Sequence, residues 1–116
     1  MVKGRWRLVI IGGLKMNNLD EMYISNIKQH STLTMINKMF EEMNEYYNEL
    51  KEIFEYVYND SPIPQELLEK FISESADIEN VKLQLDMIFN IESEVKQVKP
   101  QKMSRQLNRN RKLVLE

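Results

Sequence analysis

The sequence predicts an all-α protein with two long antiparallel helices and a shorter C-terminal helix. Apolar residues recur at alternating steps of three and four over two long segments, which is the period of a helix with one buried face. Only three glycines and three prolines occur in the chain, too few for a turn-rich β architecture. With 116 residues, the chain is long enough for one hydrophobic core.

The N-terminal segment, residues 1–15, differs from the rest and is expected to lie outside the domain. Met16 offers a second start, because Gly12–Gly13 can be encoded by a sequence that contains a bacterial ribosome-binding site. We therefore expect 1–15 to be a translated leader or a loosely packed arm, and 16–116 to be a single helical domain. The alternative is a real N-terminal strand or arm with buried apolar side chains.

The first long helix is expected from Leu33 to about Tyr58, after a short helix around Leu19–Ile27. Ser31 or Thr32 can cap it, because a hydroxyl there accepts a hydrogen bond from an unpaired amide of the first turn. Its predicted buried stripe consists of Ile36, Phe40, Met43, Tyr47, Leu50, Phe54 and Val57. Further apolar residues widen this stripe, namely Met39, Tyr46 and Ile53.

Residues 59–64 interrupt the pattern, since two prolines in six residues cannot continue a helix. The second long helix is expected from about Gln65 to Asn90, followed by a short helical piece. Pro100 suits the first turn of a last, basic helix that runs to about Arg111. The predicted buried stripe of the second helix is Leu67, Phe71, Glu74, Ile78, Val81, Leu85 and Ile88.

Charge is distributed unevenly along the chain. Residues 41–94 carry 15 acids and three lysines, whereas residues 96–116 carry seven bases and one acid. This arrangement could place a cation and an anionic substrate side by side, or it could reflect a solvated acidic helix face and a frayed basic end. The chain has no cysteine, which excludes a disulfide, a thiolate zinc site and a cysteine nucleophile.

The composition also bears on location and assembly. No apolar run approaches the roughly 20 residues that a membrane-spanning helix needs, so we expect a cytoplasmic protein without a membrane partner. Two long helices and a short third form a thin core for one chain. Wide apolar stripes pack as four-helix bundles, so we expect dimerisation to complete the core, as a homodimer or a homotetramer.

Four carboxylates form the main candidate site. Glu42 and Glu45 lie one turn apart on one helix face, and Glu74 and Asp77 repeat this spacing on the second helix. Antiparallel packing would bring the four together, and like charges at that range favour a bound cation. Oxygen ligands without cysteine or clustered histidine select Mg²⁺ or Mn²⁺ over zinc.

An ordinary solvated acidic face is the alternative to a metal site. The first helix carries three more glutamates at similar spacing, Glu49, Glu52 and Glu55. Glu74 favours the metal site, because it occupies a position where the period requires an apolar residue. A buried carboxylate without a partner costs several kcal/mol.

Two of these segments resemble the metal-binding signatures of the MazG-like nucleotide pyrophosphohydrolases, an all-α superfamily that includes dimeric dUTPases. They are Phe-Glu-Glu-Met-Asn-Glu-Tyr-Tyr at 40–47 and Phe-Ile-Ser-Glu-Ser-Ala-Asp-Ile at 71–78. Residues 76–89 resemble the helix that follows the second signature in short phage and bacterial members. Residues 95–105 resemble their basic C-terminal segment, so that the similarity covers about residues 33–110.

The resemblance implies Mg²⁺-dependent hydrolysis of a nucleoside triphosphate between the α and β phosphates, giving the monophosphate and pyrophosphate. It implies magnesium ligands at Glu42, Glu45, Glu74 and Asp77. Lys102 and Arg105 would contact phosphate, and Glu41 or Glu45 would serve in catalysis. Family members often have two adjacent acids where this chain has Ser73-Glu74.

Two other functions remain open from the sequence. The Ser73 departure motivates a catalytically inactive oligomerisation or regulatory protein on the same helical scaffold. Residues 96–112 could instead bind nucleic acid, but they lack the interleaved aromatic side chains that stack on bases. A nucleic-acid partner is therefore the least favoured reading.

Overall fold

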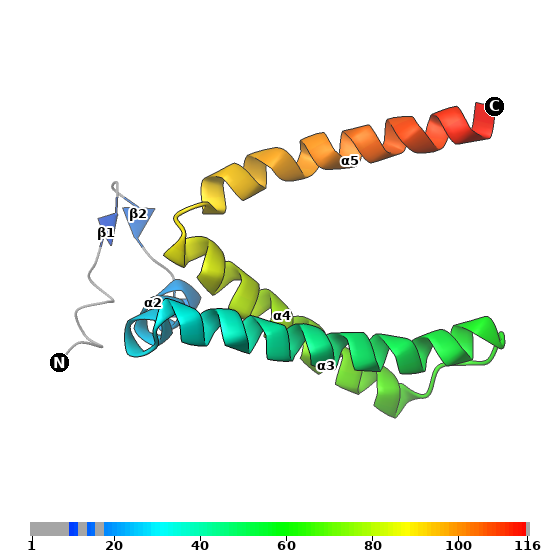
Figure 1. The fold of residues 1–116 in the computed structure, drawn as a ribbon, viewed down its shortest axis with the longest axis horizontal. Helices are drawn as coiled ribbons and strands as arrows, with labels where there is room; N and C mark the ends of the chain where they lie inside the picture. Colours follow the sequence, from blue (N-terminus) through cyan, green and yellow to red (C-terminus); the bar gives the residue numbers. More distant parts are fainter. Residues whose placement is uncertain (1–9, 12–13, 16–17, 116) are drawn as a thin grey trace. The chain divides into compact units, whose positions relative to one another are not determined.

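The computed structural model of the protein describes residues 10–11, 14–15 and 18–115. It is all-α apart from two strands of two residues each, so the predicted fold class is confirmed (Figure 1). The helices in the described part of the chain are α2 (Asn18–Gln29), α3 (Thr32–Tyr58), α4 (Gln65–Ile88) and α5 (Glu92–Leu115). The bounds of α3 and the start of α4 match the expected positions within one residue.

The expected leader, residues 1–15, falls largely outside the described residues, and Trp6 is among those that are not described. Within it, β1 (Ile10–Ile11) pairs antiparallel with β2 (Leu14–Lys15), with Ile10 opposite Lys15. Both the leader and the alternative of a real N-terminal arm stay predictions, as does the boundary at Met16.

The chain forms two compact units, Met1–Leu85 and Asp86–Glu116. The first contains α2, α3 and most of α4. The second contains the last turn of α4 and all of α5.

Local sequence signals explain where the long helices begin and end. The Ser31 hydroxyl accepts a hydrogen bond from the amide of Thr34 at 3.1 Å, as expected for the residue that caps α3. Asp60 and Asn90 adopt positive φ angles of 52° and 56° just beyond α3 and α4. At both ends an amide two residues beyond the cap bonds back to the last turn, which is a Schellman motif.

In the first unit, α3 and α4 run antiparallel and lie side by side, joined by residues 59–64 (Figure 1). Their contact includes the rings of Tyr46 and Phe71, whose centroids are 5.0 Å apart. Helix α2 is held to α4 by polar bonds: the Tyr23 hydroxyl donates to Asn80 Oδ1 at 2.7 Å. The most buried apolar side chains of this unit are Tyr23, Met35, Ile53, Leu67 and Val81.

The prediction of a buried stripe on α3 is wrong for most of its members. Six residues of that stripe are exposed, by fractions between 42% and 62%: Phe40, Met43, Tyr47, Leu50, Phe54 and Val57. The inward stripe lies one residue earlier along the helix, at Met35, Met39, Glu42, Tyr46, Glu49, Ile53 and Tyr56. Since adjacent residues are about 100° apart around a helix, the real inner face is rotated by that angle from the expected one.

The stripe predicted on α4 is confirmed. Leu67 and Val81 are buried, and the remaining members are half-buried, including the acid Glu74. The period therefore identified the inner face of α4 correctly, and it placed one carboxylate on that face.

The prediction for the C-terminal region is wrong in two respects. Helix α5 is not shorter than α4, since both have 24 residues. It is also continuous, with Pro100 in its interior rather than in its first turn. Proline removes one intrahelical hydrogen bond, here to the carbonyl of Lys96. Because Lys96 is exposed, water can satisfy that carbonyl.

No helix in the described ranges is both long enough and apolar enough to cross a membrane. A cytoplasmic location stays a prediction.

Candidate functional site

Helices α3 and α4 bring three of the four predicted metal ligands together. Glu42 and Glu45 come from α3 and Glu74 from α4, and each offers a carboxylate oxygen within 4.8 Å of the others. The Tyr46–Phe71 ring contact lies at the same level of the hairpin and fixes the separation of the two helices there. We refer to Glu42, Glu45 and Glu74 as the carboxylate cluster.

The members of the carboxylate cluster differ in burial. Glu42 is only 4% exposed, Glu74 is half-buried and Glu45 is exposed. The Oε2 atoms of both Glu42 and Glu74 are buried and have no hydrogen-bond partner. An unpartnered buried polar atom carries a full desolvation penalty, and a bound cation would remove it. The cluster thus presents two oxygens that lack a ligand.

Lys38 partly neutralises the cluster. Its Nζ atom lies 3.0 Å from Glu42 Oε1 and 3.6 Å from Glu41 Oε2. The hydrogen bond and the negative charge of Glu42 raise the pKa of Lys38 above its ordinary value, so the lysine is protonated. One oxygen of Glu42 is therefore paired with an ammonium group, and the other is not.

The pKa of Glu74 responds to the negative charges around it. Burial raises the pKa of Glu74 above its ordinary value, and hydrogen bonding to Glu45 raises it further. The negative charges of Glu45, Asp77 and Glu42 act in the same direction. A divalent cation would reverse this effect, because it favours the ionised carboxylate.

Asp77 and Glu41 lie at the margin of the site. Asp77 is exposed and is not part of the carboxylate cluster, although its charge reaches Glu74. Glu41 keeps 67% of its side chain exposed and contacts Lys38. The roles of Asp77 as a ligand and Glu41 in catalysis stay predictions.

Glu49 joins the candidate residues only in the structure, since its spacing in the sequence is also typical of a solvated helix face. It is half-buried, and its Oε2 atom is buried without a hydrogen-bond partner. It follows Glu45 by one turn on the inner stripe of α3. The available signal was its spacing of seven residues from Glu42, which keeps both on one helix face.

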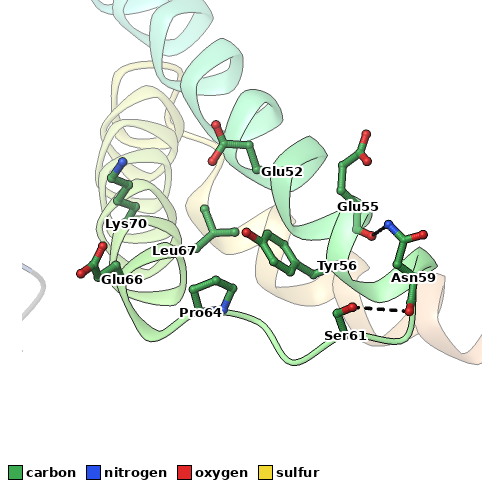
Figure 2. A pocket seen from close by; sticks show the side chains of 9 residues that line it. All are labelled: Glu52, Glu55, Tyr56, Asn59, Ser61, Pro64, Glu66, Leu67 and Lys70. Carbon is green, nitrogen blue, oxygen red and sulfur yellow. Dashed lines mark hydrogen bonds between the residues drawn. The ribbon is translucent and has the colours of Figure 1, made fainter.

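A cleft of about 560 Å³ lies at the turn end of the α3–α4 hairpin (Figure 2). Leu67 and Tyr56 are drawn at its centre, with Glu52 from α3 and Lys70 from α4 on its rim. The remaining lining residues are Glu55, Asn59, Ser61, Pro64 and Glu66. Glu52 and Tyr56 continue the stripe of Glu42, Glu45 and Glu49 at steps of three and four. The cleft and the carboxylate cluster therefore share one face of α3, with Glu52 about 10 Å beyond Glu45 along the axis.

The two predicted phosphate-binding residues, Lys102 and Arg105, lie on α5 and are exposed. They belong to the second unit. Their contact with phosphate stays a prediction.

Comparison of the chain with protein-family models, with curated proteins and with solved structures found no match.

Proposed function

We propose that this protein is a Mg²⁺-dependent pyrophosphohydrolase that converts a nucleoside triphosphate into the monophosphate and pyrophosphate. The observation that carries the proposal is the carboxylate cluster, in which two helices bring three carboxylates within 4.8 Å and bury two unpartnered oxygens. The resemblance of segments 40–47 and 71–78 to MazG-like signatures supports the same reaction.

The residues of the cluster fit a magnesium or manganese ion. All donors are carboxylate oxygens, which suit hard divalent cations, and the chain has no cysteine to favour a softer one. Asp77 follows Glu74 by one turn and would supply a fourth carboxylate. The absent second acid at Ser73 leaves this site with fewer carboxylates than the family signature has.

When bound, such a cation would neutralise phosphate charge and lower the pKa of an attacking water. Glu42 and Glu74 would hold it, because they are the members with buried, unpartnered oxygens. Glu45 is exposed at the edge of the cluster, so it is the carboxylate best placed to take a proton from water. Glu41 is the second candidate for this step.

The cleft offers a place for the nucleoside part of the substrate. It continues the face of α3 that carries the cluster, and Tyr56 presents an aromatic ring there (Figure 2). Carboxylates such as Glu52 can accept hydrogen bonds from sugar hydroxyls. Lys70, on the rim, would balance part of the charge of the phosphates.

We further propose that the protein is a homodimer or homotetramer assembled through the exposed apolar stripe of α3. Six large apolar side chains along one helix face form a surface of the kind that marks a protein interface. Burying this stripe against a second copy would produce the four-helix core that the two long helices cannot complete alone.

Pyrophosphate release from a panel of nucleoside triphosphates, with and without Mg²⁺, tests the proposed function. We expect metal-dependent release, and a loss of at least about a hundredfold in Glu74→Gln. Glu69→Gln is the matched control, since Glu69 is an exposed acid on another face of α4. It should retain wild-type activity.

The negative results separate the alternatives. If no triphosphate is hydrolysed while Mg²⁺ still raises the melting temperature, the protein is an inactive scaffold that keeps the cation site. If Mg²⁺ changes neither activity nor melting temperature, the proposed function is rejected. Salt-sensitive retention on heparin that is lost on truncation after Lys96 would support nucleic-acid binding instead.

A further inference from the structure

Lys38 contacts the carboxylate cluster. Neither the helical pattern nor the proposed reaction explains this contact. It precedes Glu42 by one turn on α3, and its ammonium group lies 3.0 Å from Glu42 Oε1. Glu42 is the most buried member of the cluster. The lysine thus pairs with the carboxylate that would otherwise be the most costly to bury uncompensated.

The same lysine opposes a cation at this site. A divalent ion held by Glu42 and Glu74 would lie close to an ammonium group of the same sign, and the two would repel. The lysine side chain is 51% exposed, so it can turn into solvent without breaking core contacts. Its flexible four-carbon stem permits that movement.

We propose that Lys38 is an internal counter-cation, which holds Glu42 in the metal-free protein and is displaced when Mg²⁺ or Mn²⁺ binds to the carboxylate cluster. This inference rests on the cation site of the proposed function. Lys38 stabilises the fold before the ion arrives, and it lowers the affinity of the site for the ion. Free ion therefore has to exceed a higher concentration to occupy the cluster.

A second lysine of α3 provides a matched control. Lys51 lies on the same helix, but its ammonium group is 5.3 Å from the centroid of the Tyr47 ring, on the exposed apolar face. Removing either charge changes the net charge of the protein equally. Lys38 forms an ion pair with Glu42 of the carboxylate cluster, whereas Lys51 lies over the Tyr47 ring.

The experiment is a Mn²⁺ titration followed by electron paramagnetic resonance, which reports free ion without requiring substrate. We expect Lys38→Met to bind Mn²⁺ about three- to tenfold more tightly than wild type, because an attractive competitor and a repulsive charge are both removed. Lys51→Met should stay within about twofold, since exposed charges at longer range are screened. Lys38→Gln keeps a hydrogen-bond donor without the charge, and it should also bind Mn²⁺ more tightly than wild type. This second variant keeps the proposal testable if Lys38→Met does not fold.

Thermal melting provides the second readout. Without metal, Lys38→Met should melt below wild type, because the buried Glu42 loses the ammonium group 3.0 Å from its Oε1 atom. At saturating Mn²⁺ this difference should close, since the ion then neutralises Glu42 in both proteins. A merely structural ion pair would leave the difference unchanged.

The outcomes distinguish this inference from the proposed function. If wild type binds Mn²⁺ and Glu74→Gln does not, but Lys38→Met binds no more tightly than wild type, the counter-cation role is overturned and the cation site stands. A melting difference that persists at saturating Mn²⁺ has the same meaning. If neither wild type nor Lys38→Met binds Mn²⁺, both the cation site and the role of Lys38 are overturned.

Discussion

Both faces of α3 depart from the usual arrangement. The inner face carries Glu42 and Glu49 among its apolar residues, and both have a buried oxygen without a hydrogen-bond partner. The outer face carries a row of large apolar side chains that includes Phe40, Tyr47 and Phe54, each more than half exposed. A helix of an isolated small protein would place its charges outside and its apolar residues inside.

This arrangement indicates that each face of α3 lacks a binding partner in the single chain. Buried carboxylates are stabilised by a cation, and an exposed apolar row is stabilised by another protein surface. The two requirements concern different residues on two faces of the helix about 100° apart. Each can therefore be tested without disturbing the other.

The largest effect is expected from removing the charge of the most buried carboxylate on the inner face. Glu42→Gln should weaken Mn²⁺ binding by at least about a hundredfold, since even residues that only orient metal ligands contribute about ten- to a hundredfold. Isothermal titration with Mn²⁺ measures this, with the exposed neighbour Glu41→Gln as the control. Equal effects of the two substitutions would show that burial does not select the ligand.

On the outer face, a charge in the middle of the apolar row should break self-association. Phe54→Glu should raise the apparent dissociation constant of the dimer at least about tenfold, because a desolvated charge without a partner is costly in an interface. Sedimentation velocity over a range of concentrations measures it. Ile72→Glu is the control, since Ile72 is 64% exposed on α4 and lies outside the row. If both variants sediment like wild type, the row is not the interface.

The pH dependence of stability tests the crowding of charges at Glu74. The pKa of Glu74 is raised in the folded protein by burial and by Glu45. As the pH rises through the interval between the unfolded and the raised folded pKa, the unfolded chain has already released its proton and the folded stability falls. The melting temperature of the metal-free protein should therefore be higher at about pH 5 than at neutral pH, relative to Glu74→Gln.

Glu74→Gln should also melt above wild type at neutral pH without metal, and it should lose the stabilisation that Mn²⁺ produces in wild type. Both results are expected of a residue that binds a metal ion at a cost to the stability of the metal-free fold. If the melting temperatures of wild type and Glu74→Gln change with pH in the same way, Glu74 does not have a raised pKa in the folded protein.

The smallest effect is expected at Glu49. Replacing it by methionine, which has a similar length, removes a buried unpartnered oxygen and should raise the free energy of unfolding by about 1 kcal/mol. Glu52→Met, one turn further at an exposed position, should change it by less than about 0.5 kcal/mol. Urea denaturation measures both. A destabilised Glu49→Met protein would mean that Glu49 has a stabilising partner.

The sequence predicts local features of this protein more accurately than its long-range features. The Ser31 cap, the interruption at 59–64 and the end of α4 near Asn90 were predicted correctly, because short segments of chain determine them. The frequency of proline in first helical turns predicts such a position for Pro100, but Pro100 lies inside α5, where water at the exposed Lys96 can satisfy the carbonyl that it leaves unpaired.

The carboxylate cluster was anticipated for a geometric reason. Antiparallel packing of two helices that each carry an acidic pair predicts that these carboxylates come together, and in the structure Glu42, Glu45 and Glu74 do so. The sequence could not show which of two neighbouring stripes of α3 is buried. Nothing in the sequence therefore distinguishes Lys38 or Glu49 from the other charged residues of α3. Both became visible only through side-chain contacts.

By itself, the sequence determined the bounds of α3, the start of α4 and the acidic pairs on these two helices, because these depend on local hydrogen bonding and on residue spacing. Only the tertiary structure decided which of two neighbouring stripes of α3 faces inward. Apolar periodicity favours the stripe with Phe40 and Phe54, but contact with α2 and α4 buries the stripe with Met35, Glu42 and Ile53. The rotation is about 100°, and it places two acids among the buried apolar residues while large apolar side chains such as Phe40 and Phe54 stay exposed.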